Sequence, residues 1–440
     1  MDWLISILEV TERDGTSMVT IPLVAFIALF VTIVALMLIV WSVKRRRDPH
    51  LKLQGESDLH ELLPTITGLT HDSLQEGNAV EILQNGDGFF PTLIREMEKA
   101  EASITFETYL WKDGELAQRI VSVLERKALA GVEVKLLLDG SGGKGIGRKV
   151  TKRLRDAGCK VHRFHPIRIS NLGTINNRDH RKIVVVDGKV GFVGGHCIVD
   201  TWLGNAEDKK HFRDITARVE GPIVGRLQSV FAENWIEETG DAPSGEKFFP
   251  KQEKKGDAGA HLIYVSPAGS TSSVKMLHYL AIHAAKKQIR IQNPYFLPDP
   301  DAIDAFGEAV ARGVDVRVMI PAADATDNAL VQHASHHRFG ALLEKGVRLY
   351  EYRRTLLHQK VFTVDHMWSG IGSTNFDDRS FEVNDEVTLG IVDADIARQL
   401  EEIFDADMLE ADEVKPDVWK KRAIWHKAVD QLTFLLNEQL

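Results

Sequence analysis

The sequence predicts an α/β protein with two related lobes, each a mixed sheet flanked by helices, behind an N-terminal transmembrane helix. Three observations carry this prediction: a short polar motif that occurs twice, a repeated order of apolar strands and helices, and one long stretch without charge. Apolar strands that alternate with helices of about 10 to 15 residues are typical of mixed or parallel sheets covered on both faces.

The N-terminal segment is the clearest departure from a globular composition. Residues 19–43, VTIPLVAFIALFVTIVALMLIVWSV, carry no charge, and a helix of that length would reach about 37 Å, more than a hydrocarbon core of about 30 Å. KRRR at 44–47 follows directly, whereas four acidic residues and one arginine precede the span in 1–18. The positive-inside rule places 44–440 in the cytoplasm. We expect a single-pass protein of the cell inner (cytoplasmic) membrane, with 44–76 as a basic juxtamembrane linker; an uncleaved targeting segment is the alternative.

The two predicted lobes share one order of elements. In the first lobe (77–238), apolar runs predict strands at 80–83, 104–111, 131–139 and 159–164, with helices at about 90–102, at 115–130 and before the last strand. In the second lobe (261–417), strands are predicted at 261–267, 289–298, 313–321 and 346–352, with helices at about 274–287, 301–312 and 329–345. The polar segment 239–260 is the expected linker between the lobes.

The C-terminal segment 418–440 has an amphipathic pattern. Val418, Trp425 and Val429 fall on one helical face, and Lys420 and Lys421 lie off it. This pattern suits a membrane-proximal helix lying against anionic lipid, or an ordinary amphipathic helix packed on the domain.

Composition narrows the functional classes. The net charge of −9 disfavours a dedicated nucleic-acid binder. The two cysteines, Cys159 and Cys197, provide neither a disulfide framework nor a cysteine metal site.

The motif H-x-K-x4-D occurs twice at matched spacing. The first copy is His180, Lys182 and Asp187, and the second is His358, Lys360 and Asp365. The histidines lie 358 − 180 = 178 residues apart, and a Gly-Gly or Gly-Ser pair begins 14 residues after each, at Gly194 and Gly372. Two complete copies indicate an internal duplication that builds one composite site.

The residue types in this motif suit phosphodiester chemistry. Residues two apart on a strand face the same side, so each histidine projects with its lysine. Two lysines can neutralise the non-bridging oxygens of a phosphodiester as charge builds. One neutral imidazole can attack phosphorus to form a phosphohistidine, and the other can serve as general acid and base. This chemistry needs no metal, and we expect no cofactor.

Two further carboxylates are candidates for orienting the imidazoles. Asp187 and Asp365 stand at odd spacing from their histidines, so we interpret both motif aspartates as structural more than chemical. Asp214 and Glu386 begin later strands, 214 − 180 = 34 and 386 − 358 = 28 residues after the histidines. A catalytic imidazole needs such a partner to set its tautomer. We expect each carboxylate to serve the histidine of its own half.

These motifs, with GSTN at 372–375 and NFDDRSFEVNDE at 375–386, resemble the phospholipase D superfamily, and bacterial cardiolipin synthases in particular. The resemblance covers about 77–440. It implies a duplicated phospholipase D-like fold and transfer of a phosphatidyl group between two phosphatidylglycerol molecules, which releases glycerol. It also implies that His180 is the nucleophile and His358 the general acid/base. The implied partners are phospholipids and the membrane, without nucleic acid.

Substrate-binding candidates follow from the same regions. They are Gly194, Gly195, Ser373, Asn375, Glu107 and Tyr295. The family usually carries asparagine three residues after the first glycine in both halves. Here Asn375 occupies that position in the second half, but Cys197, beside His196, occupies it in the first. A thiol does not replace an amide as donor and acceptor.

Several alternatives stay open at this point. A hydrolytic phospholipase D would use the same residues with water as acceptor, and a phosphatidylserine-forming transferase would use another alcohol. A nuclease is disfavoured by the net charge and the predicted span, and a non-catalytic scaffold by two intact His/Lys sets. GSGGKGIG (140–147) suits a flexible loop near the cavity mouth better than a dinucleotide fingerprint. HASHHR (333–338) suits a polar helix better than a metal site.

Overall fold

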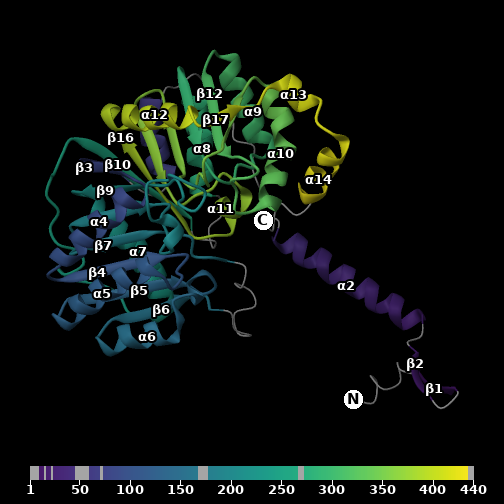
Figure 1. The fold of residues 1–440 in the computed structure, drawn as a ribbon, viewed down its shortest axis with the longest axis horizontal. Coiled ribbons are helices and arrows are strands. Elements are labelled where there is room, and N and C mark those ends of the chain that lie inside the picture. The colour runs from purple at the N-terminus through teal and green to yellow at the C-terminus, as the bar shows by residue number, and fades with distance from the viewer. Residues whose placement is uncertain are drawn as a thin grey trace. The chain divides into compact units, whose positions relative to one another are not determined.

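The computed structural model describes residues 9–13, 16–20, 23–44, 59–69, 73–166, 177–265 and 272–434 (Figure 1). The chain divides into two compact units, Met1–His50 and Leu51–Leu440. The first unit contains an antiparallel pair, β1 (Glu9–Arg13) and β2 (Thr16–Thr20), followed by the helix α2 (Leu23–Lys44).

The helix α2 covers most of the predicted membrane span. Its large apolar side chains are exposed within 25–35, among them Phe26, Phe30 and Val31. Over the residues that the structure describes, no helix has both the length and the apolarity needed to cross a membrane. The transmembrane segment therefore stays a prediction.

The second unit is organised around one mixed sheet of 15 strands. Its first-half part runs, in spatial order from the centre, β3 (Gln75–Gln84), β9 (Ile215–Glu220), β8 (Val190–Gly194), β7 (Ile183–Val186), β4 (Ser103–Thr108), β5 (Glu133–Asp139) and β6 (Lys160–Phe164). Its second-half part runs β10 (Ala258–Val265), β16 (Glu386–Val392), β15 (Trp368–Gly372), β14 (Val361–Val364), β11 (Gln288–Gln292), β12 (Asp315–Pro321), β13 (Arg348–Tyr352) and β17 (Ala411–Glu413).

The first seven strands of each part follow the same order, so the sheet repeats itself outward from its centre. The two parts meet where β10 pairs antiparallel with β3, and Ala258 lies opposite Asn78. The predicted mixed α/β fold is confirmed, with one difference: the two expected sheets are joined edge to edge. The lobe boundaries drawn from the sequence stay predictions.

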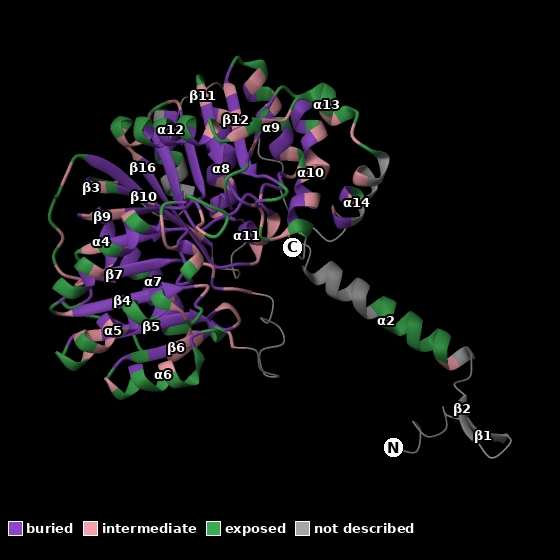
Figure 2. Cartoon of the chain, in the orientation of Figure 1, coloured by how far each residue is buried: buried purple, intermediate pink, exposed green. Residues whose placement is uncertain are grey.

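Helices cover the sheet, and buried residues concentrate along the strands (Figure 2). They are α4 (Asn85–Lys99), α5 (Glu115–Leu129), α6 (Gly147–Asp156), α7 (Ile223–Thr239), α8 (Ser273–Ala284), α9 (Pro300–Ala311), α10 (Ala329–Glu344) and α12 (Ala394–Met408). Local sequence sets several ends: Asp299 caps α9 through its carboxylate, and Gly240 ends α7 with φ of 70°. The predicted strands 104–111 and 289–298 end earlier than expected, at Thr108 and Gln292, because the chain leaves the sheet there.

A shared core joins the two halves across the central strands. It combines Val185 and Val193 of the first half with Leu262, Val387 and Leu389 of the second. All five side chains are at most 1% exposed. The two halves therefore share one hydrophobic core across the central strands.

The expected linker is held against the first half. Phe248 is buried, Ser103 Oγ donates to the carbonyl oxygen of Lys247 (2.6 Å), and Gln252 Nε2 donates to that of Gly188 (2.8 Å). β10 already begins at Ala258, inside the range predicted as linker.

The C-terminal helix α14 (Ile424–Phe434) packs on α10. Asp430 lies 2.8 Å from His333 Nδ1 and forms an ion pair with Arg422 (2.6 Å). The ring of Phe434 stacks on that of His337, with centroids 4.4 Å apart. Two roles were expected for this segment, and these contacts favour an amphipathic helix packed on the domain. Contact with the membrane stays a prediction. His333, His336 and Asp430 lie close together; His336 also contacts Glu351 (3.0 Å), and Asp430 pairs with Arg422.

Candidate active site

The two motif histidines lie where the halves meet, just before strands β7 and β14. Main-chain bonds cross between the halves at both places. The N–H of His180 donates to the carbonyl oxygen of Asp385 (2.9 Å), and that of His358 donates to the carbonyl oxygen of Arg213 (2.8 Å). Each histidine is therefore fixed against the residue that precedes a carboxylate of the other half.

The side chains of the two histidines also contact residues of the opposite half. His180 Nδ1 lies 2.9 and 3.0 Å from the two carboxylate oxygens of Glu386, and His358 Nδ1 lies 2.8 Å from Asp214 Oδ2. The expected pairing within each half is wrong: Glu386 partners His180, and Asp214 partners His358. The cross-half main-chain bonds explain this, because they place each carboxylate opposite the histidine of the other half.

Both carboxylates are fully buried and held by further donors. Asp214 accepts bonds from Trp202 Nε1 (2.7 Å) and the main-chain N–H of Ile215 (2.8 Å). Glu386 accepts from the hydroxyl of Ser373 and from Asn384 Nδ2 (3.3 Å).

These surroundings keep both acids ionised. Burial by itself raises the pKa of the Asp214 carboxyl, but its electrostatic interactions with His196, His358 and Lys360 and its hydrogen bond with His358 outweigh burial and lower that pKa. Burial also opposes ionisation of Glu386, whose pKa is lowered overall by His180, Lys182 and Ser373. Each histidine therefore faces a carboxylate anion through Nδ1.

The imidazoles are neutral at neutral pH. Burial lowers the pKa of His180 to about 4, although Glu386 acts in the opposite direction. Burial, followed by the charge of Lys360, also lowers the pKa of His358. A neutral ring whose Nδ1–H is donated to a carboxylate presents an unprotonated Nε2.

Each motif lysine contacts its own histidine, although neither pair lies on a strand as the i, i+2 argument assumed. Lys182 Nζ and Lys360 Nζ each donate to the carbonyl oxygen of their histidine at 2.6 Å. Lys360 Nζ also lies 3.0 Å from Nε2 of His358. Burial, reinforced by Lys182 and opposed by Asp214, lowers the pKa of Lys360 to about 7.

The motif aspartates lie at the opposite ends of β7 and β14 from the histidines. Asp187 accepts main-chain N–H bonds from Glu101, Ala102 and Ser103 at 2.7–2.9 Å. Asp365 accepts the equivalent bonds from Lys286, Lys287 and Gln288 at 2.7–2.9 Å. Both turn residues have positive φ, 52° and 56°. The structure therefore does not bring them to the histidines, which matches their interpretation as structural residues.

The glycine pair of the first half makes room for the carboxylate. A Cβ at Gly195 would lie 2.3 Å from Asp214 Oδ1, and one at Gly194 would lie 2.4 Å from Thr216 Oγ1. Ser373 occupies the position of Gly195 in the second half, and its hydroxyl donates to Glu386. These positions thus support the orienting carboxylates, and direct substrate binding by them stays a prediction.

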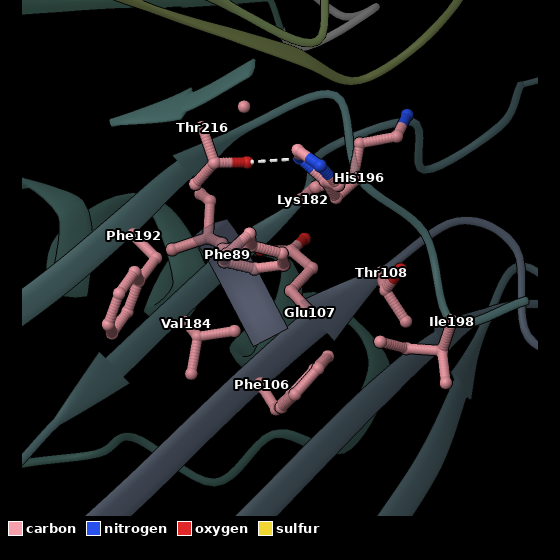
Figure 3. Close-up of a pocket in the computed structure, with 12 residues that line it drawn as sticks. Phe89, Phe106, Glu107, Thr108, Lys182, Val184, Phe192, His196, Ile198 and Thr216 are labelled. Atoms are coloured by element: carbon pink, nitrogen blue, oxygen red, sulfur yellow. Dashed lines mark hydrogen bonds between the residues drawn. The ribbon is translucent and has the colours of Figure 1, made fainter. Parts of the chain in front are cut away.

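The other substrate-binding candidates are placed differently. Glu107 is fully buried and accepts a bond from Asn234 Nδ2 (2.9 Å), and burial raises its pKa to about 7. It lines a cavity of about 20 Å³ with Thr108, His196 and the stem of Lys182 (Figure 3). That cavity has room for about one water molecule and not for a headgroup. Glu107 thus shares this small cavity with Lys182, where a substrate headgroup does not fit.

Tyr295 and Asn375 belong to the second half. The hydroxyl of Tyr295 donates to Asp327 Oδ1 (2.7 Å), and the side chain is partly exposed. Asn375 is 5% exposed, and its Oδ1 atom has no partner among the described residues. Cys197, at the equivalent position, is buried, and burial raises the pKa of its thiol.

Two aromatic side chains complete the site. The ring of Tyr109 packs edge-on against His180, with centroids 5.0 Å apart, and that of Trp202 packs against His358 at 5.1 Å. Nothing in the sequence marked Trp202, because its role depends on a fold that brings residue 202 beside residue 358.

Comparison with known proteins identifies the family of this arrangement. The family model "Cardiolipin synthase, PLD-like domain" matches residues 93–208 and 280–408. A cardiolipin synthase of Alkalihalophilus pseudofirmus is 34% identical over 88% of this chain and 80% of its own length. Cardiolipin synthase 2 of Bacillus cereus is 35% identical over 81% and 70%.

A solved structure supports the fold. The phosphatidylserine synthase of Haemophilus influenzae superposes with a TM-score of 0.66 at 14% identity, covering 85% of this chain and 98% of that one. This likeness concerns the fold alone. Together, the repeated motif, the composite site and the matches over most of the chain show that this protein belongs to the cardiolipin synthase family with phospholipase D-like domains.

Proposed function

We propose that this protein makes cardiolipin by transferring a phosphatidyl group from one phosphatidylglycerol to another, with release of glycerol. The observation that carries this proposal is the pair of cross-half dyads, His180–Glu386 and His358–Asp214, with a lysine bonded to the carbonyl oxygen of each histidine. Relatives that match most of the chain bear the name cardiolipin synthase.

The first half-reaction uses the two histidines in different roles. Nε2 of neutral His180 attacks phosphorus, so that an N–P bond forms and the P–O bond to glycerol breaks. His358, as the imidazolium, gives its proton to the departing glycerol oxygen. A bound phosphodiester anion favours that protonated form, because a negative charge close to the ring raises its pKa. Lys182 and Lys360 stabilise the charge on the non-bridging oxygens.

The second half-reaction reverses these steps with a new alcohol. A glycerol hydroxyl of the second phosphatidylglycerol loses its proton to neutral His358 and attacks phosphorus. The P–O bond of cardiolipin forms, the N–P bond breaks, and His180 returns to its neutral state. No cofactor is required in either step.

The choice of acceptor separates this proposal from its nearest alternatives. A hydrolytic phospholipase D would give phosphatidic acid, and a phosphatidylserine-type transferase would use serine. Purified protein with labelled phosphatidylglycerol in micelles should give cardiolipin and free glycerol in equal amounts, resolved by mass. Phosphatidic acid as the main product would contradict the synthase proposal.

We also propose that α2 anchors the protein as a single transmembrane helix, with the catalytic part in the cytoplasm. The exposed apolar side chains of Phe26, Ile27 and Phe30 support this, because water would disfavour such a surface. The protein should stay in the membrane fraction after alkaline carbonate extraction. Release into the supernatant would contradict the anchor without affecting the proposed reaction.

A further inference from the structure

The glycine-rich segment 140–147 lies at the same end of the strands as His180. β4 and β5 are parallel, whereas β7 pairs antiparallel with β4. The C-terminal ends of β4 and β5 therefore lie beside the N-terminal end of β7. The short helix η1 (Gly142–Lys144) and then α6 follow directly after β5. Asp139, the last residue of β5, accepts a main-chain bond from Asp179, which precedes His180 (3.1 Å).

This segment is closely packed, which corrects the expectation of a flexible loop. A Cβ at Gly142 would lie 2.5 Å from the carbonyl oxygen of Tyr109, and one at Gly145 would lie 2.3 Å from that of Trp111. Ser141 and Gly142 both donate main-chain N–H bonds to Asp139 at 2.8 Å. The glycines therefore allow a close approach, and the segment forms a firm support next to Tyr109.

Three cations project from this support into solvent. Lys144, Arg148 and Lys149 are exposed, and none of them has an ion-pair partner among the described residues. Further along α6 the pattern changes, because Lys152 pairs with Asp156 (2.5 Å) and Arg153 pairs with Glu125. We call Lys144, Arg148 and Lys149 the basic rim.

Among the described residues, the equivalent place in the second half shows no such surface. The segment between β12 and α10 carries Asp324 and Asp327 instead. Asp324 pairs with Lys209 (2.7 Å), and Asp327 accepts the hydroxyl of Tyr295. In a chain with a net charge of −9, the basic rim is thus a local feature of the first half.

We infer that the basic rim is a docking surface for the headgroups of an anionic phospholipid bilayer. Charge complementarity selects this occupant, because the substrate of the proposed reaction is an anionic lipid; the inference rests on that proposed function. Each exposed lysine or arginine near such a surface strengthens binding about fivefold, so the rim contributes on the order of a hundredfold. Contact there holds the edge that carries His180 against the bilayer surface.

Amide hydrogen exchange in nanodiscs tests this inference on the full chain. The comparison uses nanodiscs of phosphatidylcholine alone and nanodiscs of phosphatidylcholine mixed with phosphatidylglycerol. We expect main-chain exchange across 141–150 to slow several-fold with the anionic lipid, and to return to the phosphatidylcholine rate at about 1 M salt, where charges are screened within about 3 Å. Equal exchange in both nanodiscs at low salt would overturn the inference.

A matched pair of triple variants separates the rim from overall charge. The test variant is Lys144→Gln, Arg148→Gln and Lys149→Gln. The control is Lys189→Gln, Lys286→Gln and Lys287→Gln, which removes the same charge from the opposite edge of the sheet, beside Asp187 and Asp365. Anionic protection should disappear in the first and persist in the second. Protection that survives in the test variant would overturn the inference.

The same samples keep this inference distinct from the proposed function, because exchange requires no turnover. Lipid-dependent protection without cardiolipin formation would support the docking surface and contradict the synthase proposal. Cardiolipin formation by a chain without such protection would do the reverse.

Discussion

In the first half of the molecule, Asp214 reaches His358 through space left by Gly195, whereas in the second half the longer Glu386 reaches His180 beside the hydroxyl of Ser373. The shorter acid has room only because the neighbouring residue lacks a Cβ. The longer acid has an extra rotatable bond, and the serine donor fixes it. Duplicated halves have thus reached the same geometry, a buried carboxylate on Nδ1, with different side chains.

The two histidines also have different polar surroundings. His180 Nδ1 lies close to both oxygens of Glu386, whereas His358 lies close to one oxygen of Asp214 and also to Lys360 Nζ. A nearby ammonium opposes protonation of His358 until a phosphate anion arrives. This suits a residue that must switch between acid and base. We therefore expect the two halves to respond differently to substitution.

The largest expected effect is that of the histidines themselves. His180→Ala and His358→Ala should each lower phosphatidylglycerol turnover by at least about 10⁴-fold, because the covalent step or its proton transfer is lost. A phosphatidyl ester of p-nitrophenol needs no acid for its leaving group. With it, His358→Ala should still release a burst of nitrophenol, whereas His180→Ala should not. A burst in His180→Ala would contradict the assignment of the nucleophile.

Gly195→Ala should be the next most damaging change. Its new Cβ would lie 2.3 Å from Asp214 Oδ1 and would displace that carboxylate from His358. We expect turnover to fall by about 10² to 10⁴-fold, as when a histidine loses its orienting acid. The matched control is Ser373→Ala, which removes the hydroxyl that donates to Glu386 and accepts from the main-chain N–H of Val387, but adds no bulk beside the carboxylate. It should cost about tenfold at most. Equal losses in the two variants, measured as kcat/KM, would refute this contrast between the halves.

A smaller effect is expected at Glu107, whose second-half counterpart by strand register is Gln292. Burial raises the pKa of Glu107 to about 7, above its ordinary value of 4.5, so the folded state binds the proton more tightly than the unfolded state. Its contribution to stability is full below about pH 4.5 and is lost as pH rises toward 7. Glu107→Gln removes that loss. The difference in Tm between variant and wild type, measured by thermal unfolding, should be a few degrees more favourable to the variant at pH 8 than at pH 5. An equal difference at the two pH values would contradict a raised pKa for Glu107.

Much of the fold could be predicted from sequence because its signals are local. The strands that became β5 and β12 follow helix–glycine junctions at Gly131 and Gly313, both with positive φ. The structural placement of Asp187 and Asp365 followed from odd spacing along a strand. These inferences need only neighbouring residues.

The pairing of the halves could not be predicted in the same way. Spacing suggested that Glu386 orients His358, since only 28 residues separate them. The β-bridge between Asp179 and Asp385 instead places Glu386 next to His180. The contact of Trp202 with His358 and the burial of Glu107 behind Lys182 likewise depend on long-range packing. Sequence distance therefore does not tell which of two homologous histidines a carboxylate will contact.

Each motif histidine contacts a carboxylate of the other half, and we expect that carboxylate to orient it for catalysis. Rapid-quench labelling with phosphatidyl p-nitrophenol, followed by peptide mapping, tests it most directly. Asp214→Asn should accumulate label on His180, because only the base that activates the second alcohol is impaired. Glu386→Gln should form that label at least about a hundredfold more slowly. The reverse pattern, slow labelling in Asp214→Asn and accumulation in Glu386→Gln, would contradict the cross-half arrangement.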